Sequence, residues 1–317
     1  MSEATLRSKT QYSGALAWLA LALLWPLGAG AQSAAERPIA PPAEGARRGA
    51  VPESVRVLDA AIEQLTGAPL YRDNAVELLL DGPQTHAAML EAIASAEHHV
   101  HLVTYILADD EVGRRFAVAL AAKAREGVTV RLLYDSIGSR DVSGDVWEEL
   151  QAAGVNVRTF NPPDPIEDQN PFDIDTRDHR KLLIVDGRVA FTGGINIDRN
   201  YARPSDAVGG KSASSGWRDT HIRIAGPAVA AFQELFVGLW QELDGPLTKP
   251  PYAPQRLKEG NTPVRVLSGV GGNDEVSQIW IAYQAAAKVA RERIWITQSY
   301  FAPDDALLPP TASDGRA

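Results

Sequence analysis

The chain contains no cysteine among its 317 residues. This absence excludes a disulfide scaffold, a thiolate zinc site, an iron–sulfur cluster and a thiol nucleophile. Basic residues are in the minority, because 31 Lys and Arg stand against 40 Asp and Glu and leave a net charge of −9. Such a balance argues against non-specific nucleic-acid binding, which depends on neutralising phosphates. Beyond the N-terminal region, no apolar run is long enough to span a bilayer.

Composition and length fit a folded, globular protein. Hydrophobic residues make up 45% of the chain and charged residues 22%, which separates it from intrinsically disordered proteins. At about 150 residues per domain, the length allows one large domain or two modest ones.

Residues 1–31 have the features of a secretory signal peptide. A basic start precedes an apolar run from Gly14 to Leu27, and Ala29-Gly30-Ala31 supplies small residues for cleavage. An uncleaved membrane anchor is the alternative, since the apolar stretch reaches the lower limit for a span. We therefore expect an exported protein, either periplasmic or on the periplasmic face of the inner membrane. Residues 32–53 are rich in Ala, Pro and Gly and are interpreted as a linker.

Strand-like and helix-like segments alternate from residue 75 onward. This alternation indicates an α/β fold with a largely parallel sheet covered by helices on both faces. The expected strands are 75–80, 100–107, 128–134 and 155–160, and the expected helices are 85–97, 112–126 and 146–153. A hairpin is expected after a loop at 161–178, because Asp186-Gly187 separates the apolar runs 181–185 and 188–192.

The segment from Ala92 to Asp110 resembles the segment from Ala286 to Asp305. Each combines a helix end, a strand, a Tyr and an Asp-Asp pair. We interpret them as parts of a duplicated unit, although two unrelated βα units would share the same periodicity. The predicted organisation is a first unit at 54–245, a linker at 246–261 and an incomplete second unit at 262–317.

One of the six histidines lies in a setting that suits anion chemistry. His179 and Lys181 are two residues apart on an expected strand, so their side chains project to the same face. Lys181 can hold a phosphoryl oxygen while neutral His179 attacks phosphorus or transfers a proton. A polar strand edge is the alternative interpretation of this pair. His98, His99 and His101 have no carboxylate partner at metal-ligand spacing, and we interpret them as structural.

The residues that follow extend the candidate site. Gly193-Gly194 is expected to let backbone N–H groups approach a ligand, and Asn196 is expected to add a donor. Asp186 has the parity opposite to that of His179 and lies at the hairpin turn. This position favours an orienting or structural role over direct attack on the substrate.

The spacing His179-x-Lys181-x4-Asp186, followed by Gly-Gly-x-Asn, resembles the signature of the phospholipase D superfamily. The wider sequence resembles the bacterial cardiolipin synthase branch, in five stretches that occur in the same order as in that branch. These stretches are 66–79, 131–139, 179–196, 217–229 and 301–305. The resemblance extends from about Leu65 to Leu308.

This resemblance implies a phospholipase D-like α/β fold, with a mixed or parallel sheet flanked by helices, as one complete repeat and the start of a second. It implies a phosphatidyltransferase that uses a phosphohistidine intermediate, in which a second histidine protonates the leaving alcohol and neither metal nor cofactor is needed. The implied substrate is an anionic glycerophospholipid of the phosphatidylglycerol type at a membrane surface. His179, Lys181 and Asp186 match the catalytic motif, and Asn196 lies beside it. Asp219 and His221 match a later stretch whose role is unassigned, and an exposed polar turn is an equally open interpretation of these two residues.

A second H-x-K-x4-D motif does not occur in the 317 residues. Pro309-Pro310 would also break the helix that the second unit needs at that point, so we expect a fragment or a prematurely ended chain. Two alternatives stay open. One is a single-motif phosphodiesterase or nuclease that works as a homodimer, which the acidic charge and synthase-like flanks disfavour. The other is a non-catalytic remnant that binds anionic head groups.

Overall fold

The computed structural model describes residues 53–162, 177–203, 216–247, 258–269 and 277–296. The predicted leader at 1–31 and most of the predicted loop at 161–178 lie outside these ranges. Tyr300 and the acidic pair Asp304-Asp305 of the predicted repeat lie outside them as well. Among the described helices, none combines the length and the apolar character needed to cross a bilayer.

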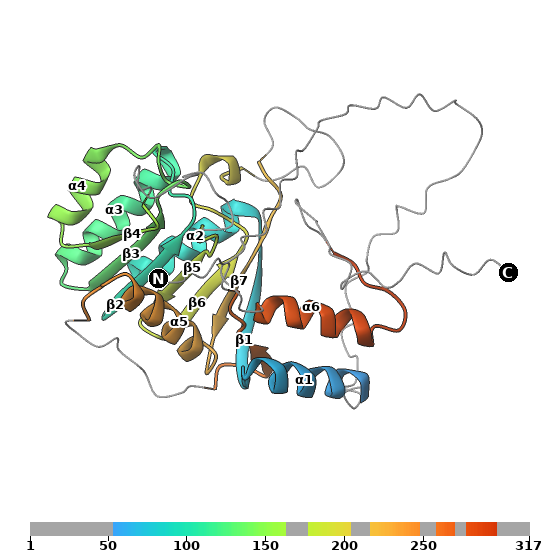
Figure 1. Ribbon diagram of the computed structural model, residues 1–317. Helices are drawn as coiled ribbons and strands as arrows, with labels where there is room; N and C mark the ends of the chain where they lie inside the picture. The colour runs from blue at the N-terminus through green and yellow to red at the C-terminus, as the bar shows by residue number, and fades with distance from the viewer. Residues whose placement is uncertain (1–52, 163–176, 204–215, 248–257, 270–276, 297–317) are drawn as a thin grey trace, which may run out of the picture. The chain divides into compact units, whose positions relative to one another are not determined.

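An eight-stranded sheet organises the described residues (Figure 1). Its strand order is β4-β3-β2-β5-β6-β7-β1-β8. The strands are β1 (Leu70–Leu80), β2 (His99–Thr104), β3 (Thr129–Asp135), β4 (Asn156–Phe160), β5 (Leu182–Val185), β6 (Val189–Gly193), β7 (Thr220–Ala225) and β8 (Thr262–Arg265).

The sheet is mixed, as the predicted fold class allows. β2 pairs with β3 and β3 with β4 in parallel, whereas the other five neighbouring pairs are antiparallel. The expectation of a largely parallel sheet is therefore wrong. The reason is that β5, β6 and β7 are added in alternating directions, without the crossover helices that parallel strands require.

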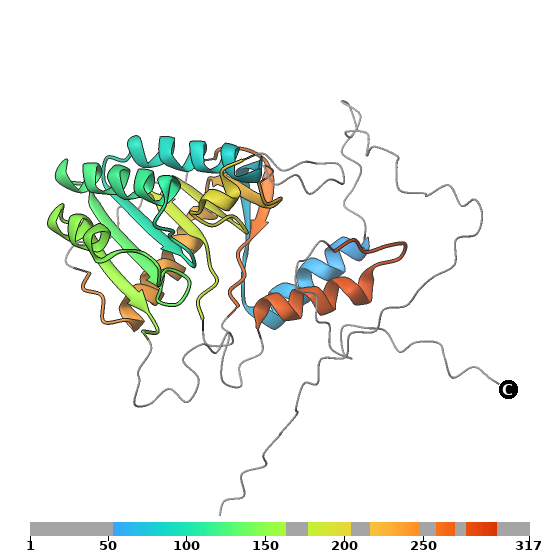
Figure 2. The ribbon, with the colours of Figure 1, turned by 90° about the horizontal axis from the view of Figure 1, so that it is seen from above.

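Helices cover both faces of the sheet. α2, α3 and α4 lie on one face and α5 on the other (Figures 1 and 2). The helices are α1 (Glu53–Thr66), α2 (Asp81–Ala94), α3 (Glu111–Arg125), α4 (Gly144–Ala152), α5 (Val229–Glu242) and α6 (Gln278–Val289). Each face has its own apolar core, in which Phe116 of α3 and Trp240 of α5 are fully buried. Burial of these side chains is the main force that holds the layers together.

The predicted elements occur with shifted ends. α2 begins at Asp81 rather than at residue 85, since the Asp81-Gly82 pair opens the helix instead of only ending the strand. Gly82 is required there because a Cβ atom would overlap the carbonyl oxygen of Tyr201. The hairpin β5–β6 forms as predicted. Asp186 (φ +53°) and Gly187 (φ +60°) both adopt the left-handed conformation that a type I′ turn needs.

Helices α1 and α6 pack side by side (Figure 2). Gln278 at the start of α6 donates from Nε2 to the carbonyl oxygen of Thr66 at 2.9 Å. The Arg265 guanidinium of β8 pairs with Asp59 of α1 at 2.6 Å. No helix was predicted over α1, although its apolar residues recur at helical spacing.

The predicted second unit contributes β8 and α6 to the described residues. β8 pairs with β1 across the predicted linker, so this strand belongs to the same sheet as the first unit. Residues 294–296, which align with β2 in the predicted repeat, form no strand, and Trp295 is 74% exposed. None of the described strands pairs with these residues, and an isolated strand is not stable on its own.

Candidate active site

Polar residues from several strands meet at one edge of the sheet. The register places the carboxyl end of β2 beside the beginning of β5, since Val103 pairs with Leu182. The end of β6 lies beside the beginning of β7, since Gly193 pairs with His221. β3 runs parallel to β2 and ends at this edge with Asp135. The fold therefore collects residues from distant parts of the sequence at a single location.

His179 and Lys181 lie together at this edge, as the sequence predicts. They precede β5 rather than forming part of it, but both contact Tyr105, which follows β2. The His179 ring stacks on the Tyr105 ring with a centroid distance of 3.9 Å. The Lys181 ammonium lies 5.1 Å from the centroid of the same ring. Lys181 Nζ also donates to the carbonyl oxygen of His179 at 2.6 Å, which draws the two residues together.

Asp135 holds the segment that carries His179. Its carboxylate is fully buried, and one oxygen accepts from the N–H groups of Ile137 and Gly138 at 2.9 Å each. The other oxygen accepts from the N–H of Asp178 at 3.1 Å. A buried carboxylate thus fixes the backbone immediately before His179.

The electrostatic environment gives the two predicted residues suitable charges for anion chemistry. Burial lowers the pKa of Lys181 to about 8, while Asp178, Asp219 and Asp135 counteract part of that effect. Burial and the nearby Lys181 charge lower the pKa of His179. At neutral pH the lysine is therefore cationic, and the imidazole is neutral and available as a nucleophile.

Asp186 lies at the other end of β5, separated from His179 and Lys181 by the whole strand. Its carboxylate accepts from the N–H groups of Glu97 at 2.8 Å, His98 at 2.8 Å and His99 at 2.7 Å. Burial alone would raise the pKa of Asp186, but these three hydrogen bonds lower it below its ordinary value. The structure does not bring Asp186 together with the other two motif residues. Its contacts join the hairpin to the beginning of β2.

The two glycines make room for the side chains of Asp219, which precedes β7, and His221 of β7. The N–H of Gly194 donates to the carbonyl oxygen of Thr220 at 3.0 Å, so the expectation that this N–H approaches a ligand is wrong. A Cβ atom on Gly194 would overlap the Asp219 carboxylate. A Cβ atom on Gly193 would lie 2.7 Å from Nδ1 of His221. Glycine is needed at both positions because the side chains of Asp219 and His221 occupy the space.

Asn196 is buried behind the site and connects three segments. Its Oδ1 accepts from the N–H of Ile106 at 3.3 Å, and its Nδ2 donates to the hydroxyl of Tyr201 at 3.2 Å. The backbone carbonyl oxygen of Asn196 hydrogen-bonds to Nε2 of His86 at 2.9 Å. These contacts use part of the hydrogen-bonding capacity of Asn196, which was expected to donate to a ligand.

Sequence reasoning assigned no role to Tyr105, Asp135 and Asp178. The available signal was their position, because Tyr105 follows one parallel strand and Asp135 ends the next. The carboxyl ends of parallel strands are the usual location of α/β binding sites.

His99 and His101 form a buried cluster on the α5 face of the sheet. Their ring centroids are 4.3 Å apart, and His101 stacks on Phe236 of α5. Nε2 of His101 hydrogen-bonds to Arg131 at 2.9 Å. Nε2 of His99 hydrogen-bonds to Gln233 of α5 at 2.8 Å. Burial lowers the pKa of both histidines. These contacts place both rings within the packing between α5 and the sheet.

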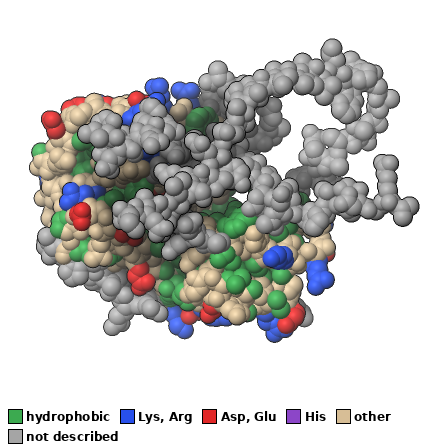
Figure 3. Space-filling view, in the orientation of Figure 1, with side chains coloured by type: hydrophobic (Ala, Val, Ile, Leu, Met, Phe, Trp, Pro, Cys, Tyr) green, Lys and Arg blue, Asp and Glu red, His purple; other side chains and the backbone are tan. Residues whose placement is uncertain are grey.

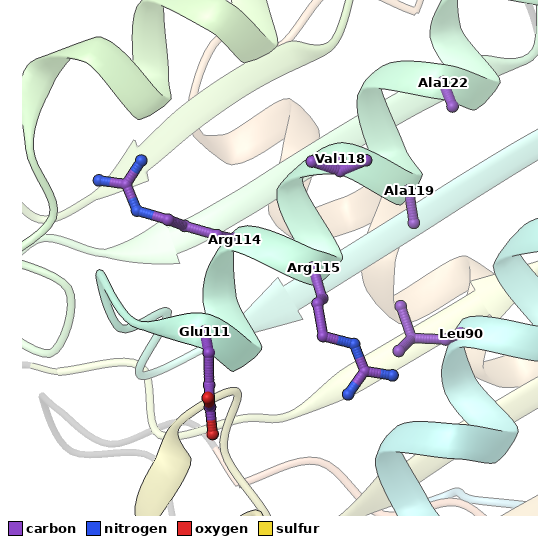
Figure 4. Close-up of a pocket in the computed structure, with 7 residues that line it drawn as sticks. All are labelled: Leu90, Glu111, Arg114, Arg115, Val118, Ala119 and Ala122. Atoms are coloured by element: carbon purple, nitrogen blue, oxygen red, sulfur yellow. The ribbon is translucent and has the colours of Figure 1, made fainter.

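A separate open groove of about 420 Å³ lies between α2 and α3 (Figure 4). Arg115 points into the space beside Leu90, whereas Arg114 points away from it and pairs with Asp109 at 2.6 Å. None of the residues predicted for the active site lines this groove.

Comparison with known proteins gives consistent matches. Residues 89–208 match the family described as "Cardiolipin synthase, PLD-like domain". The chain is 36% identical over 247 residues to a cardiolipin synthase of Geobacillus kaustophilus, covering 76% of this chain and 47% of that protein. It is equally identical over 246 residues to a cardiolipin synthase of Listeria welshimeri, covering 76% and 49%. The chain thus spans about half the length of the curated relatives it matches.

A solved structure also matches the chain. It is a phospholipase D family member, Nuc from Salmonella typhimurium, with 19% sequence identity and a TM-score of 0.38. The match covers 53% of this chain and 95% of that one. The family assignment rests on the sequence matches.

Proposed function

This chain belongs to the cardiolipin synthase branch of the phospholipase D superfamily, and we propose that it transfers phosphatidyl groups between anionic glycerophospholipids. The observation that carries the proposal is the group formed by His179, Lys181 and Tyr105 at the edge of the sheet. In this group the neutral imidazole of His179, a nucleophile, and the ammonium of Lys181, a cation, both contact the Tyr105 ring. A phosphodiester needs both, since its phosphorus is attacked while its oxygens carry negative charge.

The proposed reaction proceeds in two displacements. In the first, a ring nitrogen of His179 forms a bond to phosphorus of phosphatidylglycerol, the bond from phosphorus to the glycerol oxygen breaks, and glycerol leaves with a proton. In the second, a hydroxyl of another phosphatidylglycerol forms a bond to phosphorus and loses its proton. The bond between nitrogen and phosphorus breaks, which releases cardiolipin and regenerates neutral His179. Lys181 stabilises the phosphoryl oxygens in both displacements.

Neighbouring residues support this chemistry by position. Asp135 fixes the backbone at Asp178, and the Tyr105 ring stacks on His179. Both contacts limit the movement of the nucleophile, which favours an in-line approach to phosphorus.

A second histidine is needed in this proposal to protonate the leaving glycerol. The described residues bring one His–Lys pair to the site, and we propose that a second copy of the chain can supply the other histidine. Specific activity should then rise with protein concentration and level off as the dimer forms. Specific activity that is independent of concentration would contradict the dimer but not the transfer reaction.

The test of the proposed function is a vesicle assay with purified protein. Phosphatidylglycerol vesicles are incubated with the wild type, with H179Q and with H98Q, a control at an exposed histidine outside the site. We expect cardiolipin from the wild type and H98Q and none from H179Q. Nicking of plasmid DNA without lipid turnover would favour the nuclease alternative. Absence of lipid turnover at every protein concentration would overturn the proposal.

We also propose that the protein acts outside the cytoplasm. Support comes from the basic start and the apolar run of residues 1–31. Fractionation of cells that express the full chain, with N-terminal sequencing of the product, tests this proposal. An intact N-terminus in the cytoplasmic fraction would contradict it.

A further inference from the structure

His221 is a buried imidazole at the active-site edge with no assigned role. It is the second residue of β7 and pairs in register with Gly193 of β6 and Leu79 of β1. Its side chain lies where a Cβ atom on Gly193 would come within 2.7 Å of Nδ1. The residue is 1% exposed, so the expectation that it lies in an exposed polar turn is wrong.

Both ring nitrogens of His221 have no hydrogen-bond partner within the described part of the chain. The other three buried histidines each have one. Nε2 of His86 bonds to Asn196, Nε2 of His99 to Gln233 and Nε2 of His101 to Arg131. A neutral imidazole always carries one donor and one acceptor, and buried polar groups are nearly always paired. His221 therefore has hydrogen-bonding capacity for a group that the described residues do not supply.

Burial and the neighbouring charges keep the His221 imidazole neutral. Burial lowers its pKa to about 3, and His86 and Lys181 lower it in the same direction. Leu182 pairs with Thr192, and the next residue, Gly193, pairs with His221. This register brings the imidazole close to Lys181, which precedes Leu182 and holds the phosphate in the proposed reaction. A neutral imidazole adds an N–H donor at this position without adding a second positive charge, which would repel Lys181.

We propose that His221 is a substrate-contacting residue that donates its N–H to a phosphoryl oxygen of the bound phosphodiester, beside Lys181. This inference rests on the proposed function, because it assumes that phosphate binds at the His179–Lys181 pair. It also explains the glycine at position 193, since any larger residue would displace the imidazole. The phosphate would then be bound by one charged donor and one neutral donor.

The test uses NMR of protein in which the histidine side chains carry ¹⁵N. Inorganic phosphate is titrated into the wild type, and the signals of His179 and His221 are assigned from the spectra of H179Q and H221Q. We expect both sets of signals to move with one shared Kd. In H221F, which has no donor, phosphate binding should weaken about tenfold or more, whereas H221Q retains a donor and should bind within about threefold of the wild type.

The outcomes separate this inference from the proposed function. Movement of both histidines without any lipid turnover would support His221 as a phosphate contact and overturn the transferase. Movement of His179 alone would overturn the role of His221 and leave the transferase intact. Movement of neither would overturn both. If H221F does not fold, the wild-type titration and H221Q still decide the question.

Discussion

His179 and Asp186 belong to one sequence motif but perform separate tasks at opposite ends of β5. His179 contacts Tyr105 at the active-site edge. Asp186 receives three backbone N–H groups at the other edge. The spacing of this motif therefore reflects the packing of the β5–β6 hairpin as well as the proposed reaction. The two roles can be separated by experiment, because one residue should control turnover and the other stability.

Replacing Asp186 with Ala should destabilise the protein by at least about 2 kcal/mol. The substitution leaves three N–H groups without their acceptor at a buried position, and each unsatisfied donor is costly. Urea unfolding at neutral pH measures this change. The matched control is D141A, since the Asp141 side chain is 91% exposed and its loss should change stability by less than about 0.5 kcal/mol. Equal stability of the two variants would contradict the structural role of Asp186.

Lipid turnover should have a bell-shaped pH dependence. It should rise with pH as His179 loses its proton below the ordinary histidine value, because burial lowers the pKa of this residue. It should fall as pH passes about 8, where Lys181 loses its charge. K181R, which stays charged, should shift the alkaline decline to higher pH. A wild-type profile that is flat from pH 7 to about 9.5 would contradict the role of Lys181.

At the scale of elements, the sequence predicted most of the described strands and three of the six described α-helices (α2, α3 and α4), but not the order of the strands in the sheet. The apolar stripe of α3 predicts that helix almost to the residue. A mostly apolar run predicts β3 equally well, because this strand is buried on both faces. The Asp186-Gly187 pair predicts the hairpin locally, because both residues readily adopt the left-handed backbone conformation that the turn needs. The antiparallel pairing of β2 with β5 depends on contacts between distant residues, which local patterns do not encode.

The residues of the candidate site were likewise only partly predictable from the sequence. His179 and Lys181 were found because they are neighbours in the sequence and share chemistry. Tyr105 and Asp135 reach the site only through the sheet register, and His221 does so through its pairing with Gly193. The roles of Gly193 and Gly194 could not be predicted because the side chains that they accommodate, His221 and Asp219, are distant in the sequence.

Replacing Gly194 with Ala should disturb the β6–β7 pair and lower turnover. The added Cβ atom would overlap the Asp219 carboxylate, which contributes to the charge state of Lys181. We expect a loss of stability of about 1–3 kcal/mol. G144A is the control, because no atom lies within 4 Å of a Cβ atom there. Wild-type stability and turnover in G194A would show that this contact has no role.

At the scale of the whole molecule, buried histidines make stability depend on pH. Burial lowers the pKa of His86, His99, His101 and His221, so the folded state binds fewer protons than the unfolded state below pH 6.5. Stability is therefore complete above the unfolded value of about 6.5 and is lost as pH falls below it. The cores on both faces of the sheet contribute to this dependence.

The pH dependence can be measured by urea unfolding at pH 7.5 and 5.5. His221 alone should account for about 1.4 kcal/mol of the decrease, because its folded pKa is about 3. H221Q should reduce the difference between the two pH values by that amount. H98Q, at an exposed position, should leave the difference unchanged. Equal differences for the wild type and H221Q would show that the pKa of His221 is not lowered in the folded state.

The described surface also carries apolar side chains that favour self-association. Figure 3 shows hydrophobic side chains at the surface of the α1–α6 pair, and Leu78 on β1 is 58% exposed. Surface patches of this kind promote association. We expect concentration-dependent association in sedimentation experiments, reduced by L78K but not by V118K on α3, where Val118 is 67% exposed. Monomeric wild-type protein at all concentrations would contradict this expectation.

The central claim is that His179 forms the covalent intermediate, and mass spectrometry after an alkaline quench tests it most directly. Wild-type protein, K181M and H179Q are mixed with phosphatidylglycerol vesicles, quenched and digested. The account predicts a phosphatidyl adduct on His179 in the wild type, little in K181M and none in H179Q. Cardiolipin formation that persists in H179Q, or an adduct on another residue, would contradict it.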